Sequence, residues 1–241
     1  ARALAGIGCC HLYLSDCPRA LEYLERARVL QEELGNREEL AKTLWHLGNA
    51  HHQLGASAAA LEQHAKALKL YEERADRPMV ASIVIEMGSS HFYSSDYPRA
   101  LESYTRAVKL LEELADRNRI ALALGNLGGT YHHLGDYTRA VECVERALKV
   151  SEELGDREGM ARGLGSLCSV YDAMGSHEQA LECGRKSLKL SEELGDRPGT
   201  AKALHGMGLA FLSLTDYPAA LDCYERMLKL SEDLRDQAVV A

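Results

Sequence analysis

The sequence has no run of eighteen apolar residues, about the length that crosses a bilayer as a helix. Its first residues, ARALAGIGCCHLYL, lack the basic leader and cleavage pattern of a secretory signal. No membrane partner is therefore expected, and a cytoplasmic location is predicted. Positive charge is also scarce, since 28 Lys and Arg against 36 Asp and Glu give a formal net charge of −8. Nucleic acid is not an expected partner, because its phosphates attract basic domains.

Cysteine and catalytic patterns are equally sparse. The seven cysteines are an odd number without a CxxC pair, so the sequence carries neither a disulfide framework nor a zinc signature. No Gly-rich phosphate loop, GxSxG elbow or HExxH motif occurs. We therefore expect no enzyme activity, no cofactor and no metal. Aromatic residues make up 6% of the chain and only five residues are proline, which favours an all-α fold.

What the sequence does contain is a 40-residue repeat without insertions. Six units account for the whole chain, with boundaries near residues 1–37, 38–77, 78–117, 118–157, 158–197 and 198–237. One repeat position is glycine in five of the six units, namely Gly8, Gly48, Gly88, Gly128 and Gly208. The fifth unit has Cys168 at this position. Another is always alanine: Ala20, Ala60, Ala100, Ala140, Ala180 and Ala220. Strict register of this kind predicts a stack of similar structural units.

Each unit divides into two helical patterns separated by turn signals. In the fourth unit, apolar residues spaced by three and four fall on one face of each helix: Leu124, Leu127 and Tyr131, then Val144, Ala147 and Leu148. Gly135-Asp136 and Gly155-Asp156 combine a helix stop with an N-cap. Each unit is therefore predicted to be a helix-turn-helix hairpin.

The recurring glycine lies in the middle of the first helix, where it costs about 1 kcal/mol relative to alanine. We expect close approach of the two helices to offset that cost, with the Ala20-type residue of the second helix facing the glycine. A bulky residue at Gly128 or Ala140 is predicted to force the hairpin apart.

These residues resemble the tetratricopeptide repeat over the whole chain: Leu124, Leu127-Gly128 and Tyr131, followed by Ala140, Val144 and Ala147. The usual unit has about 34 residues, and the longer unit here is similar to the subgroup of Partner-of-Inscuteable type adaptors. The resemblance implies a right-handed α-solenoid of six antiparallel helix-turn-helix units, with a concave groove that binds protein or peptide partners.

Two histidine pairs, His51-His52 and His132-His133, could suggest a metal site. The pairs occupy different repeat positions, and neighbouring residues on a helix diverge by about 100° whereas zinc-binding helices use i,i+4 spacing. Metal binding is therefore not predicted. His11, His51 and His91 share one position and are expected to pack between helices.

The first helix of each unit has a second face, opposite its apolar positions. The resemblance implies that this face lines the groove. The predicted peptide-binding residues on it are Arg2, Lys42, Trp45, His46, Asn49, Gln53, Ile85, Ser89, Tyr93, Asn126, His133, Arg162, Ser166, Ser169, Lys202 and His205. Four permanent cations stand there against a single acid, Glu86, and Trp45, Ile85 and Tyr93 offer an apolar anchor. Ordinary solvated side chains are the alternative interpretation.

The first hypothesis is an interaction scaffold or adaptor that binds an extended or partly helical, acidic peptide. The alternative is a ligand-sensing segment of a larger signalling or ATPase protein, and a third possibility is a self-associating array. Asp236 to Ala241, DQAVVA, aligns with the opening of the third unit at Asp76 to Ala81, DRPMVA. We therefore expect an excerpt of a longer protein, and end-to-end association of this fragment.

Overall fold

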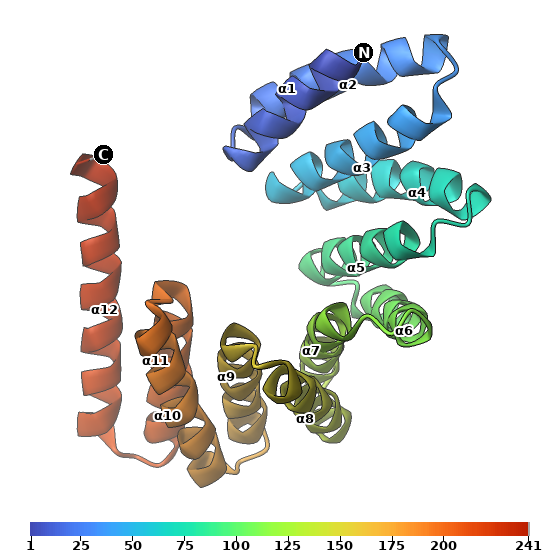
Figure 1. The fold of residues 1–241 in the computed structure, drawn as a ribbon. Helices are drawn as coiled ribbons and strands as arrows, with labels where there is room; N and C mark the ends of the chain where they lie inside the picture. The colour runs from blue at the N-terminus through green and yellow to red at the C-terminus, as the bar shows by residue number, and fades with distance from the viewer. Residues whose placement is uncertain (241) are drawn as a thin grey trace. The chain divides into compact units, whose positions relative to one another are not determined.

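The structure, a computed structural model, describes the backbone of residues 1–240 and the side chains of residues 1–232. These residues form twelve α-helices and contain no strand, so the all-α prediction is confirmed. The helices pair as six antiparallel hairpins in chain order (Figure 1). The hairpins are α1 (Arg2–Tyr13) with α2 (Cys17–Glu33), α3 (Arg37–Gln53) with α4 (Ser57–Glu73), α5 (Arg77–Tyr93) with α6 (Tyr97–Glu113), α7 (Arg117–His133) with α8 (Tyr137–Leu154), α9 (Arg157–Ala173) with α10 (His177–Leu194), and α11 (Arg197–Ser213) with α12 (Tyr217–Val240).

The chain divides into two compact units of three hairpins each. The N-terminal unit is Ala1–Asp116 and the C-terminal unit is Arg117–Ala241. Within the first, α3 contacts both α1 and α5; within the second, α9 contacts both α7 and α11. The first helices therefore form one side of each unit. The arrangement of all six hairpins as one right-handed superhelix stays a prediction.

The turns explain why the helices end where they do. Gly135 adopts a left-handed φ of 78°, which glycine tolerates, and the next residue caps α8. There Asp136 Oδ1 accepts a hydrogen bond of 3.2 Å from the backbone amide of Arg139. Equivalent Asp or Asn caps start seven further helices, whereas Ala56 before α4 provides no side-chain cap. The predicted turn signals are confirmed.

Five of the first helices have the glycine, and there the second helix packs closely against it, mainly through the side chain four residues after the alanine that the sequence suggested. A Cβ on Gly128 would lie 2.5 Å from Val144 Cγ2, and 3.1 Å from the backbone oxygen of Ala140. At Gly88 the nearest atom is Tyr104 Cε1, at 2.7 Å. The alanine position thus contributes only a carbonyl, because the side chain four residues later reaches across the glycine.

The fifth hairpin inverts this arrangement. The first helix carries Cys168 in place of glycine, and the second carries Gly184 in place of the larger side chain. A Cβ on Gly184 would lie 3.1 Å from Cys168 Sγ and 2.5 Å from Met207 Cγ. One partner of each contact is therefore small in all six hairpins, which permits the close packing that offsets the helix penalty of glycine.

An ion pair repeats along the hairpins. An arginine at the start of the first helix pairs with a glutamate near the end of the second: Arg37 with Glu73, Arg77 with Glu113, Arg117 with Glu153, and Arg157 with Glu193. All are exposed, so each adds about 1 kcal/mol at most. They neutralise these arginines within the fold.

None of the described helices combines the length and the apolar character needed to cross a membrane.

Candidate functional site

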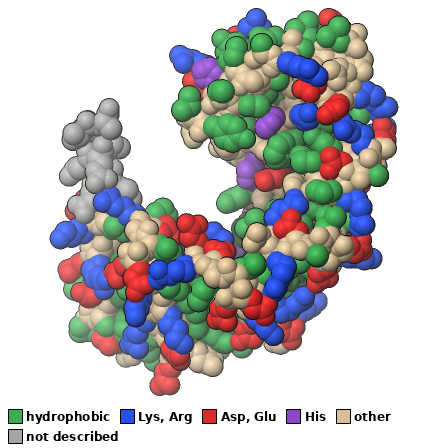
Figure 2. Space-filling model, viewed as in Figure 1, with side chains coloured by type: hydrophobic (Ala, Val, Ile, Leu, Met, Phe, Trp, Pro, Cys, Tyr) green, Lys and Arg blue, Asp and Glu red, His purple; other side chains and the backbone are tan. Residues whose placement is uncertain are grey.

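The first helices of the N-terminal unit surround a pocket of about 300 Å³. Its lining comes from α1, α3 and α5: Leu12, Tyr13, Trp45, His46, Asn49, His52, Gln53 and Glu86. In Figure 2, histidine side chains lie among hydrophobic ones over this part of the molecule. Four of the predicted groove residues, Trp45, His46, Asn49 and Gln53, are therefore brought together.

The side chain of Asn49 is positioned by a contact with α4, the second helix of its hairpin. Its Oδ1 lies 3.0 Å from Nε2 of His64, which is fully buried against Gly48. Burial lowers the pKa of His64 to about 4, so its ring is neutral near pH 7. The amide of Asn49 is thereby fixed at the edge of the pocket by an uncharged partner.

Two polar groups of the pocket have no partner in the described part of the chain. The indole Nε1–H of Trp45 is buried without an acceptor. Glu86 is half-buried and makes neither a hydrogen bond nor an ion pair with the described side chains, and burial raises the pKa of its carboxyl group. Buried polar groups in proteins are normally paired. The carboxyl group of Glu86 is partly exposed in the pocket and can accept an external partner, whereas the indole N–H of Trp45 is enclosed.

The two histidines of the pocket do not supply positive charge near pH 7. Burial lowers the pKa of His46, whose ring lies 4.8 Å from that of Trp45. Burial also lowers the pKa of His52, whose Nδ1 lies 3.0 Å from Ser90 Oγ. Glu86 is therefore the one lining residue that can carry a formal charge at neutral pH.

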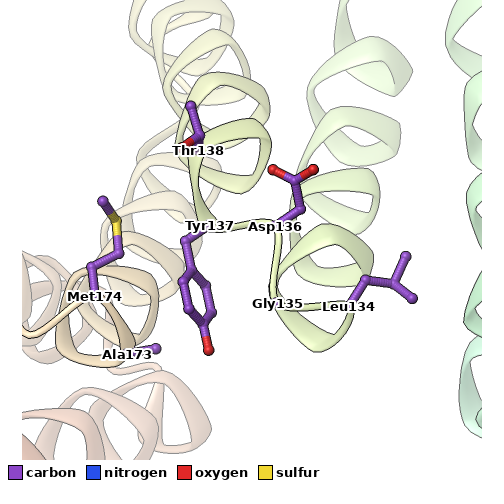
Figure 3. A pocket seen from close by; sticks show the side chains of 7 residues that line it. All are labelled: Leu134, Gly135, Asp136, Tyr137, Thr138, Ala173 and Met174. Atoms are coloured by element: carbon purple, nitrogen blue, oxygen red, sulfur yellow. The ribbon is translucent and has the colours of Figure 1, made fainter.

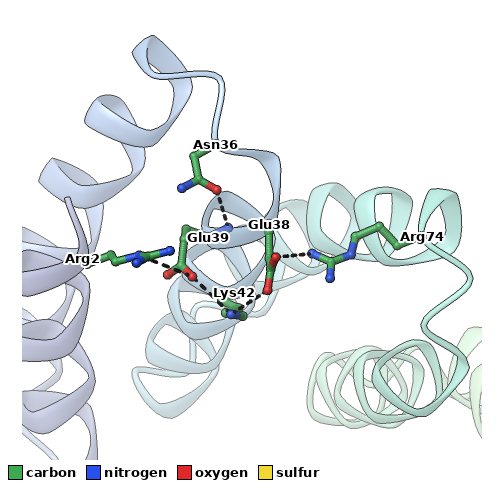
Figure 4. Close-up of polar contacts among 6 residues, drawn as sticks. All are labelled: Arg2, Asn36, Glu38, Glu39, Lys42 and Arg74. Carbon is green, nitrogen blue, oxygen red and sulfur yellow. Dashed lines mark hydrogen bonds and ion pairs between the residues drawn. The ribbon is translucent and has the colours of Figure 1, made fainter.

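The cations predicted on this face are already paired. Lys42 Nζ lies 3.0 Å from Glu38 Oε1 and 3.2 Å from Glu39 Oε1, as Figure 4 shows. Arg2 approaches Glu39 at 3.8 Å, and Arg74 approaches Glu38 at 3.6 Å. The excess of positive charge expected from the sequence is therefore balanced in the N-terminal unit.

The remaining predicted residues of this unit differ in exposure. Ile85 was expected to offer an anchor but is only 6% exposed. It is buried because more positions of α5 are buried than of the first helices in the other hairpins. Ser89 Oγ lies 3.1 Å from the hydroxyl of Tyr104. Tyr93 is 73% exposed, and its ring meets that of His52 edge-on at 5.4 Å. Tyr93 thus borders the pocket, whereas Ile85 is largely part of the core.

The C-terminal unit presents free positive charge. Arg162 on α9 and Lys202 on α11 are exposed, and neither has an acidic partner among the described residues. His205 is also exposed, and its ring lies 6.2 Å from that of Tyr224. The contact between α9 and α11 places these side chains on neighbouring helices.

Small polar residues lie beside these cations. Ser166 Oγ donates to the Arg162 carbonyl at 3.0 Å, and Ser169 Oγ donates to the Gly165 carbonyl at 3.3 Å. Asn126 is half-buried and His133 is exposed on α7. The predicted residues of this unit thus form a surface with little side-chain bulk around its charges.

The tetratricopeptide-repeat profile matches residues 1–73, 79–153 and 159–233. The chain belongs to the tetratricopeptide-repeat family. The match does not single out the long-repeat subgroup of Partner-of-Inscuteable type adaptors, which stays a prediction. No protein of curated function matches this TPR sequence.

Solved structures share the TPR fold. RapI in its apo form is 15% identical, with 98% of each chain covered and a TM-score of 0.80. A Rap protein complexed with Competence and Sporulation Factor is 17% identical, covering 97% of this chain and 75% of that one, with a TM-score of 0.71. A STAND signal-transduction ATPase with a TPR sensor, from Pyrococcus horikoshii, is 17% identical, covering 95% and 38% of the two chains, with a TM-score of 0.78. At such identities the likeness concerns the fold alone.

Other features of this TPR chain lie outside that pocket. The rings of His132 and His133 lie 5.5 Å apart, and the described residues contain no group of three or more potential metal ligands. A second pocket lies beside the turn between α7 and α8 (Figure 3), but its Asp136 is engaged with Arg139. His11 stacks on Tyr23 at 5.6 Å, in agreement with its predicted packing between helices.

The sequence did not place Leu12, Tyr13, His52 and Glu86 in the site. Tyr13 and Glu86 do belong to the predicted face, and Glu86 was conspicuous as its single acid. Leu12 and His52 lie one residue away from that face on their helices. They reach the pocket because it lies between successive TPR first helices, a contact that a single helical pattern does not reveal.

Proposed function

We propose that this chain is a protein-interaction scaffold or adaptor segment that binds an extended or partly helical peptide along its first helices. The observation that carries the proposal is the free charge on the C-terminal unit. The arginines of the hairpin ends are neutralised by glutamates, whereas Arg162 and Lys202 are exposed without such partners among the described residues. Cations left open on the first helices suit an acidic peptide, since charge-assisted hydrogen bonds are among the strongest recognition contacts.

Small residues around the cations support the same proposal. Gly125 and Gly129 on α7 leave a ligand backbone room to approach, since a Cβ at either position would meet nothing within 4 Å. Gly165 on α9, which the sequence also offered for this role, is buried against Ser187. The hydroxyls of Ser166 and Ser169 donate to their own helix but keep free acceptor capacity for ligand amides. An extended peptide with acidic side chains matches both properties.

The test is a double charge reversal, Arg162→Glu with Lys202→Glu. Partners captured by the wild-type and variant proteins are identified by mass spectrometry, and affinity is then measured with a fluorescent glutamate-rich peptide. We expect the variant to bind about tenfold more weakly or worse. Wild-type affinity should also fall with added salt, because exposed charges are screened over about 8 Å at physiological ionic strength.

The matched control is Lys149→Glu with Arg185→Glu. Both residues are exposed on second helices of the same unit, so the net charge changes equally. Circular dichroism verifies that both variants stay helical. Equal losses in the two variants, or no loss in either, would place the ligand elsewhere.

The alternative is a sensor segment of a larger signalling or ATPase protein. Its support is the likeness to the STAND ATPase, in which the matched part is 38% of that chain. A catalytic domain in the same gene product, whose activity changes when the first helices are mutated, would favour this alternative. We propose the same cytoplasmic setting for both versions, because an odd number of cysteines without a CxxC pair gives no disulfide framework.

We further propose that this chain associates with further copies of itself, end to end. Ile7 on α1 is 42% exposed, whereas its equivalents Leu47 and Leu127 are buried. On α12, Leu221 and Leu228 are 57% and 59% exposed, whereas their equivalents Leu181 and Leu188 are buried. Each of these faces is covered inside the chain by a neighbouring hairpin, so two copies can cover one another.

A further inference from the structure

The pocket of the N-terminal unit differs chemically from the C-terminal surface. Its lining combines an aromatic ring, two neutral histidines and the carboxyl group of Glu86. The nearest permanent cation on the same face of α3, Lys42, is held by Glu38 and Glu39. An acidic ligand group would find no positive partner in this pocket and would meet Glu86.

A ligand cation would satisfy the pocket. Half-buried Glu86 lacks a partner among the described residues, so an ammonium or guanidinium group can form a charge-assisted hydrogen bond with it without displacing an existing bond. The ring of Trp45 offers a face for the aliphatic stem and for a cation–π contact. Tyr93, exposed beside His52, extends this aromatic surface at the rim.

We infer that this pocket binds a basic side chain, arginine or lysine, of the peptide ligand, with Glu86 as its counter-ion and Trp45 as its aromatic wall. The inference rests on the proposed peptide binding and makes it specific. The ligand carries one basic residue for the N-terminal unit and acidic residues for Arg162 and Lys202 of the C-terminal unit. An acidic peptide without a basic residue then uses only part of the surface.

The experiment can be performed without the natural ligand. Butylguanidinium reproduces the end of an arginine side chain, and butylurea is its neutral isostere. Trp45 is the single tryptophan of the chain, so its indole N–H signal in NMR and its fluorescence report on this pocket alone. We expect saturable shifts of the indole signal with butylguanidinium, and no saturable shift with butylurea. Butylammonium distinguishes lysine-like from arginine-like binding.

The decisive variant is Glu86→Gln, which keeps the shape and removes the charge. We expect butylguanidinium to bind it about tenfold more weakly, since a charge-assisted contact is lost. The control is Glu102→Gln, an exposed glutamate on α6 of the same unit, which should bind like wild type. Because Glu86→Gln removes an unpaired half-buried carboxyl group, it should fold at least as well as wild type.

Equal binding by the wild-type protein and Glu86→Gln would overturn the inference, as would equal binding of butylguanidinium and butylurea, or no saturable shift. These outcomes are separate from those of the peptide experiment. If the reversal of Arg162 and Lys202 has no effect while butylguanidinium still saturates, the acidic-peptide proposal fails and the cation pocket stands. If the reversal weakens peptide binding while butylguanidinium gives no shift, only the pocket is excluded.

Discussion

His64 couples the stability of the N-terminal unit to acidity. It is fully buried over Gly48, and its Nε2 lies 3.0 Å from Asn49 Oδ1. Desolvation lowers its pKa from 6.5 to about 4. The unfolded chain therefore takes up a proton at a higher pH than the folded chain does, so acid favours unfolding.

The expected consequence is a loss of stability between about pH 6.5 and about pH 4, as the unfolded state is protonated first. This residue alone should contribute roughly 3 kcal/mol over that range. The variant His64→Tyr, which copies Tyr104 at the equivalent position, removes the titration and retains a ring over the glycine. Urea unfolding at pH 7, 5.5 and 4.5 measures the difference. Parallel losses in wild type and variant would contradict this account, because the other acidic and histidine groups are common to both.

Gly128 makes a prediction in which helix propensity and packing oppose one another. Alanine is the better helix former by about 1 kcal/mol, but its Cβ would lie 2.5 Å from Val144 Cγ2. Overpacking typically costs about 1–3 kcal/mol, so Gly128→Ala should be destabilising overall. When Gly128→Ala is combined with Val144→Ala, the smaller side chain at 144 should accommodate the methyl group added at 128. A double-mutant cycle by urea unfolding should then give a coupling of about 0.5–3 kcal/mol. Additive effects would show that the glycine is not needed for this contact.

At the scale of elements, α4 lacks the N-terminal side-chain cap that most other helices have. Ala56 precedes it with φ −83° and ψ 64°, close to the φ −85° and ψ 67° of the capping Asp96. Ala56→Asp should therefore accept a backbone hydrogen bond without rearrangement and stabilise the protein by about 0.5–1 kcal/mol. Thermal unfolding measures the gain. Ala65→Asp, exposed in the middle of α4, controls for the added charge and should give no gain.

The elements themselves could be predicted from the sequence, because their information is local. Glycine stops, Asp caps such as Asp136 and the spacing of Leu124 and Leu127 are read within a few residues of one another. The pairing of Lys42 with Glu38 could also have been predicted, because the two residues are four positions apart on one helix. It was missed because only the charges on the groove face were counted, and Glu38 lies beside that face. The contacts between helices could not be predicted in the same way, since the pattern of one helix does not show which residue of α4 lies over Gly48.

The pocket required three helices from three repeats, which explains why Glu86 was left out of the predicted site. Whether Glu86 has a hydrogen-bond or ion-pair partner depends on the side chains of α1 and α3 around it, which the spacing of residues along α5 does not reveal. The same holds for Ile85, whose burial reflects the wide packing of α5. Local periodicity thus predicted the helices and four of the eight residues that line the pocket, whereas the surroundings of those residues depended on contacts between repeats.

At the scale of the whole molecule, the open faces of α1 and α12 predict association. Average mass by analytical ultracentrifugation should rise with protein concentration. Leu221→Lys with Leu228→Lys should keep the protein monomeric, since charges on the α12 face oppose burial of that face. Leu54→Lys with Leu134→Lys, at exposed leucines that follow α3 and α7, should leave the association intact. A wild-type protein that stays monomeric at millimolar concentration would refute the prediction.

The inverted contact of the fifth hairpin bears on how the chain avoids misfolding. A chain of similar hairpins risks pairing a first helix with the second helix of the wrong repeat, a failure typical of repeat proteins. Cys168 on α9 fits against Gly184 on α10, but would collide with Val144 or any of the larger residues that stand at the same position elsewhere. Gly184 on α10, in turn, accommodates both Cys168 and Met207 of α11. The fifth hairpin is therefore expected to disfavour pairing of α9 with the second helix of another repeat.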